Sequence, residues 1–203
     1  MSFITAATVT TADLEELISG SPKIKEIALG LGATDMRAMH LVMGGDQAGL
    51  VQVQFDCPDV STALGVWEGL YQTNEQIDLM KRSGTQLVRR SLLRVVAERG
   101  ERSGAWGSGL LISGDPVDDA TTDSNIGDAW ANMSAGATGL LFAETIAAGA
   151  TQNVAPYYAL TWCDDMNSMM QASAANMADP KVQANMASAN AKVMGRIIAK
   201  TIL

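Results

Sequence analysis

Residues 49–60 read Gly-Leu-Val-Gln-Val-Gln-Phe-Asp-Cys-Pro-Asp-Val, a stretch that predicts a β-strand running into the start of a helix. Apolar and polar side chains alternate along Leu50–Cys57, which is the pattern of a strand with one face toward a core. The opposite face would carry Gln52 and Gln54. This strand therefore brings two polar side chains into the predicted sheet.

A helix is predicted directly after this strand, over residues 60–81. Pro58 ends the strand, and Asp59 or Ser61 can cap the first turn of the helix. The same order recurs in residues 156–166, where a strand ends in a Cys two residues before an Asp and a helix is predicted to follow. The chain thus contains one structural pattern twice.

An offset of 106 residues aligns the two stretches without gaps. Over residues 51–97 and their counterparts the alignment contains four identities: Cys57 with Cys163, Asp59 with Asp165, Met80 with Met186, and Arg90 with Arg196. Four identities in 47 positions is what chance supplies, so the internal repeat rests on the order of the predicted elements.

The order of predicted elements is β-α-β-β-α-β in each half of the chain. The predicted strands are Phe3–Val9, Asp35–Met43, Leu50–Cys57, Gln86–Ala97, Gly107–Ser113, Ala143–Ala150, Tyr157–Cys163 and Arg196–Leu203. Four helices are predicted. The first starts after Asp13, breaks at Gly20-Ser21-Pro22 and resumes as Lys23–Leu31. The others cover residues 60–81, Asn125–Leu141, and Asn167–Ala189, the last with an interruption at Asp179-Pro180. We therefore predict an α+β chain of two ferredoxin-like repeats, residues 1–98 and 105–203, joined by residues 99–104.

Composition excludes several classes of protein. The chain has 203 residues, 47% hydrophobic and 18% charged, which is enough apolar material for a packed core. Its net charge of −8 disfavours binding to nucleic acid. No apolar run approaches the roughly 18 residues of a membrane helix, and the first residues lack a basic segment followed by an apolar one. We expect a cytoplasmic protein without a membrane span.

The sequence resembles the dimeric α/β-barrel superfamily in a tandem-fused form. The turn Gly44–Gly49, the strand Leu50–Phe55 and the segment Ser91–Arg94 are similar to NIPSNAP-like bacterial proteins. Antibiotic-biosynthesis monooxygenases, polyketide cyclases, haem-degrading monooxygenases and dye-decolorising peroxidases are further relatives that the resemblance suggests. It implies two four-stranded sheets packed face to face within one chain, but no catalytic motif.

Strand composition independently favours an intrachain barrel. A single β-α-β-β-α-β unit covers one face of its sheet with helices and leaves the other face bare. Residues 35–43 and 91–96 are apolar on both faces, as expected of strands in a sheet that is covered on both sides. The other half of the chain is the simplest cover.

His40 is the single histidine and the first candidate for chemistry, as a general base or acid. Gln52 and Gln54 on the next strand, and Arg90 and Arg94 on one face of the fourth strand, are its expected neighbours. These side chains could bind a substrate carboxylate or enolate. They could equally form a structural hydrogen-bond network around a core histidine.

Trp67 and Tyr71 lie four residues apart on the predicted second helix and therefore face the same way. With Leu64 and Leu70 they make its apolar face. They could form the wall of a pocket for a flat aromatic molecule, or they could be ordinary core residues.

Metal and cofactor sites are not predicted. The stripe Met166, Met169, Met170 and Met177 and the two cysteines could be imagined as a soft Cu(I) site, but their spacing is that of core filling. Cys57 and Cys163 are expected to be buried free thiols. Haem is disfavoured because the second half contains no histidine.

Two functions follow from these residues. The first is a small-molecule-binding protein, acting if catalytic as a cofactor-free monooxygenase, cyclase or isomerase on a small carbonyl or phenolic compound. His40 would move a proton, Arg90 would hold an oxyanion, and Gln52, Gln54, Trp67 and Tyr71 would bind a small apolar or aromatic substrate. The second is a non-enzymatic carrier or a self-assembling structural subunit. In either case the Ala- and Met-rich helix over residues 167–189 predicts a homo-oligomer.

Overall fold

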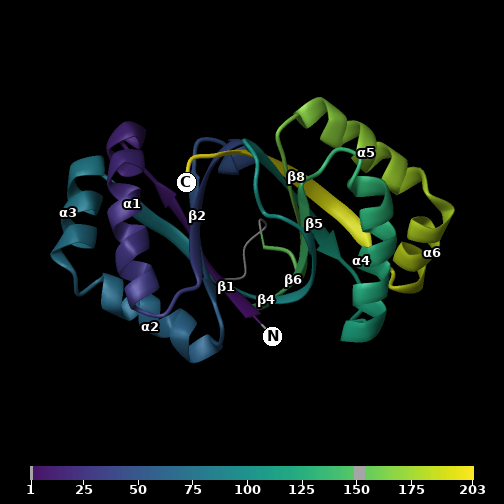
Figure 1. Cartoon of the computed structure of the whole chain (residues 1–203), viewed down its shortest axis with the longest axis horizontal. Helices are drawn as coiled ribbons and strands as arrows, with labels where there is room; N and C mark the ends of the chain where they lie inside the picture. Colours follow the sequence, from purple (N-terminus) through teal and green to yellow (C-terminus); the bar gives the residue numbers. More distant parts are fainter. Residues whose placement is uncertain (1, 149–153) are drawn as a thin grey trace. The chain divides into compact units, whose positions relative to one another are not determined.

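The computed structural model describes residues 2–148 and 154–203 as an α+β protein. The chain divides into two compact units. Unit 1 contains residues 2–94, 146–148 and 201–203, and unit 2 contains residues 95–145 and 154–200. Each unit contributes strands and helices of its own (Figure 1).

Unit 1 has the elements β1 (Ser2–Thr10), α1 (Leu14–Gly30), β2 (Asp35–Met43), β3 (Val51–Cys57), α2 (Val60–Leu70), α3 (Asn74–Ser83) and the first part of β4 (Gln86–Gly100). Strand β3 lies between β1 and β2 and runs antiparallel to both. The three helices lie together on one side of β1 and β2 in Figure 1. Side chains from α1, α2 and α3 form one apolar core with that face of the sheet, including Ile24, Val66, Leu79, Val51 and Phe55.

Unit 2 has the elements β5 (Trp106–Ser113), α4 (Asp119–Met133), β6 (Gly139–Ala148), β7 (Tyr157–Cys163), α5 (Met166–Ala178), α6 (Pro180–Ser188) and β8 (Lys192–Thr201). Strand β7 lies between β5 and β6, and β5 also pairs with β8, all antiparallel. The helices again lie on one side of the strands (Figure 1). Within the described residues, no helix combines the length and the apolar character needed to cross a membrane.

Several predicted boundaries are confirmed. Strand β2 covers Asp35–Met43 and β7 covers Tyr157–Cys163, as expected. The break at Asp179-Pro180 separates α5 from α6, because the carboxylate of Asp179 accepts hydrogen bonds from the amides of Lys181 and Val182 and so caps α6. Asp13 and Asp59 cap α1 and α2 in the same way.

The predicted single helix over residues 60–81 is wrong. The chain leaves the helix after Leu70 and starts α3 at Asn74. Thr73 accepts a hydrogen bond from the amide of Gln76 and caps the new helix. The break leaves Tyr71 at the C-terminal end of α2.

The predicted break at Gly20-Ser21-Pro22 is also wrong, since α1 runs through Pro22 without interruption. The hydroxyl of Ser21 donates to the carbonyl of Leu17 at 2.7 Å, and the packing of Leu17 and Ile24 in the core holds both halves of the helix on one face. Burial here outweighs the hydrogen bond that proline removes.

Two further elements differ from the prediction in the second half. Helix α4 begins at Asp119, ahead of the predicted start at Asn125, because Asp118 caps it through the amide of Thr121. Strand β6 begins at Gly139, inside the predicted helix 125–141. The end of the predicted strand Ala143–Ala150 lies outside the described residues. Strand β4 continues past Ala97 to Gly100, and so includes the first two residues of the predicted joint.

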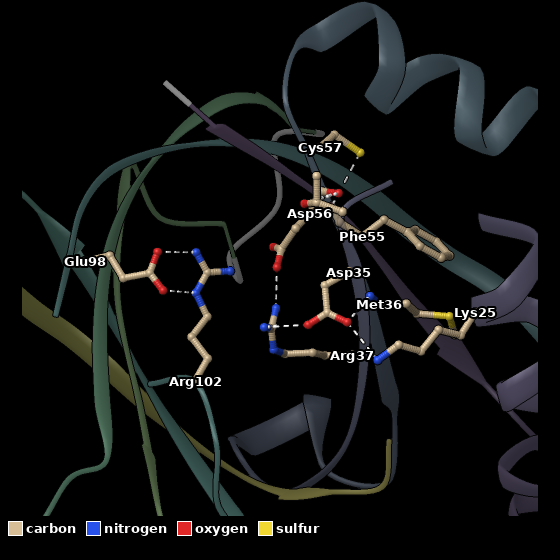
Figure 2. Close-up of polar contacts among 10 residues, drawn as sticks. Lys25, Asp35, Met36, Arg37, Phe55, Asp56, Cys57, Glu98 and Arg102 are labelled. Carbon is tan, nitrogen blue, oxygen red and sulfur yellow. Dashed lines mark hydrogen bonds and ion pairs between the residues drawn. The ribbon is translucent and has the colours of Figure 1, made fainter. Parts of the chain in front are cut away.

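An ion-pair cluster connects β2, β3 and α1 in unit 1. Figure 2 shows the guanidinium of Arg37 between the carboxylates of Asp35 and Asp56, with Lys25 on the far side of Asp35. The Lys25 Nζ lies 2.7 Å from Asp35 Oδ1, and Arg37 Nη2 lies 2.6 Å from Asp35 Oδ2. In unit 2, Glu98 and Arg102 make a separate two-pronged pair, also drawn in Figure 2.

The same cluster sets the pKa of Asp35. Burial alone would raise it, but the hydrogen bond from Lys25 and the charge of Arg37 hold it below its usual value. A carboxyl group with a lower pKa in the folded state stabilises the fold above the pKa of the unfolded chain. That contribution is lost as pH falls through the lower folded value.

Asp35→Asn should therefore reduce the free energy of unfolding by about 1 kcal/mol at pH 7. Because part of the charge of Asp35 disappears in acid, the difference from the parent protein should be smaller at pH 3 than at pH 7. Urea unfolding at both pH values measures it. Glu26→Gln, which removes an exposed pair with Lys23, is the control and should change stability by less than about 0.5 kcal/mol. An equal loss at both pH values would show that Asp35 acts through packing instead.

Gly139 marks a close approach between two backbone segments of unit 2. A Cβ atom at this position would lie 2.2 Å from the carbonyl oxygen of Glu101. Gly65 in α2 has no atom within 4 Å of the equivalent point. The two glycines therefore offer opposite tests of the same substitution.

Gly139→Ala should destabilise the fold by about 1–3 kcal/mol, since β6 would have to move away from Glu101. Gly65→Ala should stabilise it by about 0.5–1 kcal/mol, because alanine favours a helix interior. Chemical denaturation of both variants tests the pair. Unchanged stability of the Gly139 variant would contradict the close approach.

Candidate functional site

Trp67 anchors the candidate site on α2 of unit 1. Its side chain is buried, and its Nε1 donates to the hydroxyl of Thr5 on β1 at 2.6 Å. Phe55 on β3 meets the indole edge to face, with ring centroids 4.8 Å apart. Tyr71 lies next to it at the end of α2, with ring centroids 6.3 Å apart and planes inclined by 29°. Packing against two strands fixes the indole in one orientation.

Arg90 on β4 places its guanidinium over these aromatic rings. Its Cζ lies 4.4 Å from the centroid of the Trp67 ring and 5.2 Å from that of Tyr71. One nitrogen, Nη2, donates to the Tyr71 hydroxyl at 3.0 Å. The rings attract the cation through their negatively charged faces, which is worth about 0.5–2 kcal/mol.

The charge of Arg90 is not neutralised within the described part of the chain. No described carboxylate pairs with it, and its Nε is buried without a hydrogen-bond partner among the described residues. A buried donor without a partner costs about 1–3 kcal/mol. Arg90 therefore keeps hydrogen-bonding capacity and positive charge that an anionic ligand could use.

An open pocket of about 560 Å³ lies beside Arg90. Its described lining residues are Thr5, Leu64, Trp67, Glu68, Tyr71, Arg90, Ser91, Leu92, Ala147 and Ala148. This volume is in the range of small-molecule sites. The lining is mostly apolar, with one cation, one carboxylate and a few hydroxyl groups. Such a surface suits a molecule with an apolar or aromatic body and one negatively charged oxygen.

The helix face toward this pocket differs from the predicted one. Ala63, Val66, Trp67 and Leu70 are buried, whereas Leu64 is 63% exposed. The pocket is lined instead by residues 64, 67, 68 and 71, which are spaced three, one and three residues apart along the helix. Trp67 belongs to both faces.

Glu68 is the lining residue that the sequence analysis missed. It is exposed and is the one carboxylate among the described lining residues. The spacing of Leu64, Glu68 and Tyr71 could have indicated a shared face of α2, had that face not been assigned to the core.

His40 does not line this pocket. It is half-buried on β2, opposite Val51 in the antiparallel register. The alternation of β3 places Gln52 and Gln54 on the other face from Val51. The six predicted site residues therefore fall into three places: Arg90, Trp67 and Tyr71 together, Gln52 and Gln54 together, and His40 separate from both.

Gln52 and Gln54 bind each other. The Nε2 of Gln54 donates to Oε1 of Gln52 at 3.0 Å, and Gln54 is 3% exposed. In the register Gln54 lies opposite Ala6 of β1 and Arg37 of β2. This pair uses part of the hydrogen-bonding capacity that a ligand would need.

The two cysteines are buried, free thiols, as predicted. Burial, together with the nearby charges of Asp56 and Asp59, raises the pKa of Cys57 to about 11. Burial also raises the pKa of Cys163. Both thiols therefore stay protonated near neutral pH, where they are weak nucleophiles.

The described residues offer no grouped metal ligands, and the described lining of the candidate pocket contains no histidine or cysteine that could bind haem iron. No three His, Cys, Asp or Glu side chains within them lie close enough to hold an ion together. The cysteines lie in apolar clusters of the two units, and His40 does not line the pocket. The described residues of the candidate site therefore provide no axial ligand for a haem iron.

Known proteins resemble this chain in structure but not in sequence. No protein-family profile and no curated protein sequence matches it. A proposed monooxygenase from Lactobacillus acidophilus NCFM superposes with a TM-score of 0.60 at 9% identity, covering 98% of this chain and 92% of that one. TA0507, a proposed chlorite dismutase, gives a TM-score of 0.60 at 7% identity, covering 98% and 94%.

A mutant chlorite dismutase from Candidatus Nitrospira defluvii, solved in complex with cyanide, gives a TM-score of 0.59 at 8% identity, covering 98% of this chain and 90% of that one. At these identities the likeness concerns the fold alone. A closer relationship to NIPSNAP-like proteins stays a prediction. The chain shares the fold of these solved structures.

Proposed function

We propose that the protein binds a small molecule with an aromatic or apolar body and one anionic oxygen, in the pocket beside Arg90. The observation that carries this proposal is the arginine itself, which has no carboxylate partner among the described residues and a buried, unpartnered Nε at an open pocket. Arg90 would hold a carboxylate, phenolate or enolate oxygen. Trp67 and Tyr71 would orient the guanidinium and contact the body of the ligand.

The catalytic form of this proposal is a cofactor-free monooxygenase, cyclase or isomerase acting on a small carbonyl or phenolic compound. Such chemistry needs an oxyanion holder and a base. Arg90 is suited to the first role. The sequence suggests His40 for the second role, but Glu68 is the carboxylate among the described pocket residues and His40 is not one of them. Gln52 and Gln54 would contribute only to a ligand that reaches the other face of β3.

A non-enzymatic carrier is the alternative, because an open apolar pocket with a single carboxylate can bind a ligand without transforming it. Large exposed apolar side chains such as Met43 and Leu64, each 63% exposed, also support the proposal of a self-assembling homo-oligomer. The names of the similar structures, which include monooxygenases and chlorite dismutases, favour chemistry on small molecules over a purely structural role.

We also propose that residues 1–98 and 105–203 are tandem ferredoxin-like repeats, joined by residues 99–104 and forming an intrachain α/β barrel. The support is that each unit follows the order β-α-β-β-α-β, with its second helical segment divided in two, and carries its helices on one face of its sheet. A sheet with one bare apolar face needs a partner layer.

Binding can be measured by titrating the protein with 2-naphthoate and following tryptophan fluorescence. Arg90→Gln should weaken binding at least tenfold, because it removes the charge that holds the carboxylate. 2-Naphthamide, which has the same body without the charge, should bind the parent protein about as weakly as naphthoate binds the variant.

Arg82→Gln is the matched control. It removes an exposed arginine that pairs with Glu16 in the same unit, so naphthoate should bind it like the parent protein. Equal affinity for naphthoate in the Arg90 and Arg82 variants would contradict the proposed site.

Oxygen uptake or product formation with a bound phenol separates an enzyme from a carrier. If Glu68 is the base, Glu68→Gln should lower kcat about 100-fold or more with little change in KM, whereas His40→Ala should leave kcat near the parent value. The reverse result would assign the proton transfer to His40. Binding without any turnover would support the carrier.

A further inference from the structure

Arg196 occupies in unit 2 the place that Arg90 occupies in unit 1. Both lie on the last strand of their unit, and the offset of 106 residues relates them. The same offset relates Trp67 to Ser173, and each arginine contacts that partner: Arg90 lies over the indole, and Arg196 bonds to the hydroxyl. The two units therefore direct an arginine toward the same position of a helix.

The surroundings of Arg196 consist of neutral groups. Its Nη2 donates to Ser173 Oγ at 2.6 Å, and its Nη1 donates to Ser108 Oγ at 3.2 Å. The sulfur atoms of Met170 and Met169 lie 3.4 Å and 4.0 Å from Nη1. Burial lowers the pKa of this guanidinium, which reflects the cost of keeping a cation there.

No described carboxylate neutralises this charge. By contrast, Arg99 pairs with Asp123 and Lys181 pairs with Asp128 in the same unit. Arg196 has none within the described residues. A half-buried cation without a counter-charge is destabilising, which is tolerable where an anion completes the site.

The two serines have hydrogen-bonding capacity to spare. Ser108 and Ser173 are each 5% exposed, and each accepts a hydrogen bond from Arg196. Buried helical serines elsewhere in this protein donate to the carbonyl four residues earlier, as Ser21 does to Leu17 at 2.7 Å. Ser173 makes no such bond to a described residue, so its O–H remains available as a donor.

We propose that unit 2 carries a second anion-binding site, in which Arg196 and the hydroxyls of Ser173 and Ser108 hold a small oxyanion. The guanidinium supplies the charge, and the two O–H groups supply neutral donors. Unlike the pocket beside Arg90, this site has no aromatic ring among its described contacts, so it should select a compact carboxylate or phosphate over a flat aromatic one. Met170, which is 41% exposed, is the most exposed of the side chains that contact Arg196 here.

The test is a titration of the full chain with sodium phosphate and, separately, with sodium acetate, each at constant ionic strength. Two-dimensional ¹H–¹⁵N spectra follow the backbone signal of Ser173 and the side-chain Nε–H signal of Arg196. A saturable shift with either ion supports the site, and the ion that produces it identifies a phosphate or a carboxylate ligand. Shifts that stay linear with both ions would overturn the proposal.

Two variants make the result specific. Arg196→Gln should weaken binding of the ion at least tenfold, while Arg90→Gln should leave it unchanged, which separates this site from the one in unit 1. Should Arg196→Gln fail to fold, Ser173→Ala keeps the charge, removes one donor and should weaken binding at least threefold. Undiminished binding by the folded variant would overturn the proposal.

Discussion

A positive charge with no counter-charge among the described residues is the constraint that organises the candidate site. Arg90 is held over Trp67 by attraction between the cation and the ring, and by one hydrogen bond to Tyr71. These contacts orient the guanidinium but offset only part of its desolvation, because a ring face is a weaker partner than a carboxylate. The buried Nε remains unused by the described residues. An anionic ligand would complete what the protein leaves incomplete, which is why a binding role is preferred to a purely structural one.

Local capping builds the pocket around that charge. Thr73 caps the N-terminus of a new helix that starts at Asn74. Helix α2 therefore ends at Leu70, and Tyr71 is its C-cap residue. At this position Tyr71 is 36% exposed and can contact both Arg90 and the open pocket. One hydroxyl cap therefore decides whether the tyrosine forms part of a helix interior or the wall of a site. Such coupling between a cap and a site is a local effect that long-range periodicity does not reveal.

The sequence predicted the α+β class and the bounds of β2 and β7, because glycines, prolines and alternating side chains mark these strands clearly. It misplaced the break after Leu70 because Thr73 and Gln76 form a weak cap signal within an otherwise helical pattern. It identified Trp67, Tyr71 and Arg90, but grouped Arg90 with His40. That grouping depended on which face of β4 meets the helices, which is set by tertiary packing. Glu68 was missed because its face of α2 was taken as core.

The likeness to solved structures gives the fold, while the residues of this chain give the chemistry. A crystal structure of the protein with 2-naphthoate tests the central claim most directly. We expect the carboxylate to lie within hydrogen-bonding distance of Arg90 Nε and the naphthalene ring to contact Tyr71. A carboxylate bound away from Arg90, or an Arg90 guanidinium paired with a protein carboxylate, would contradict it.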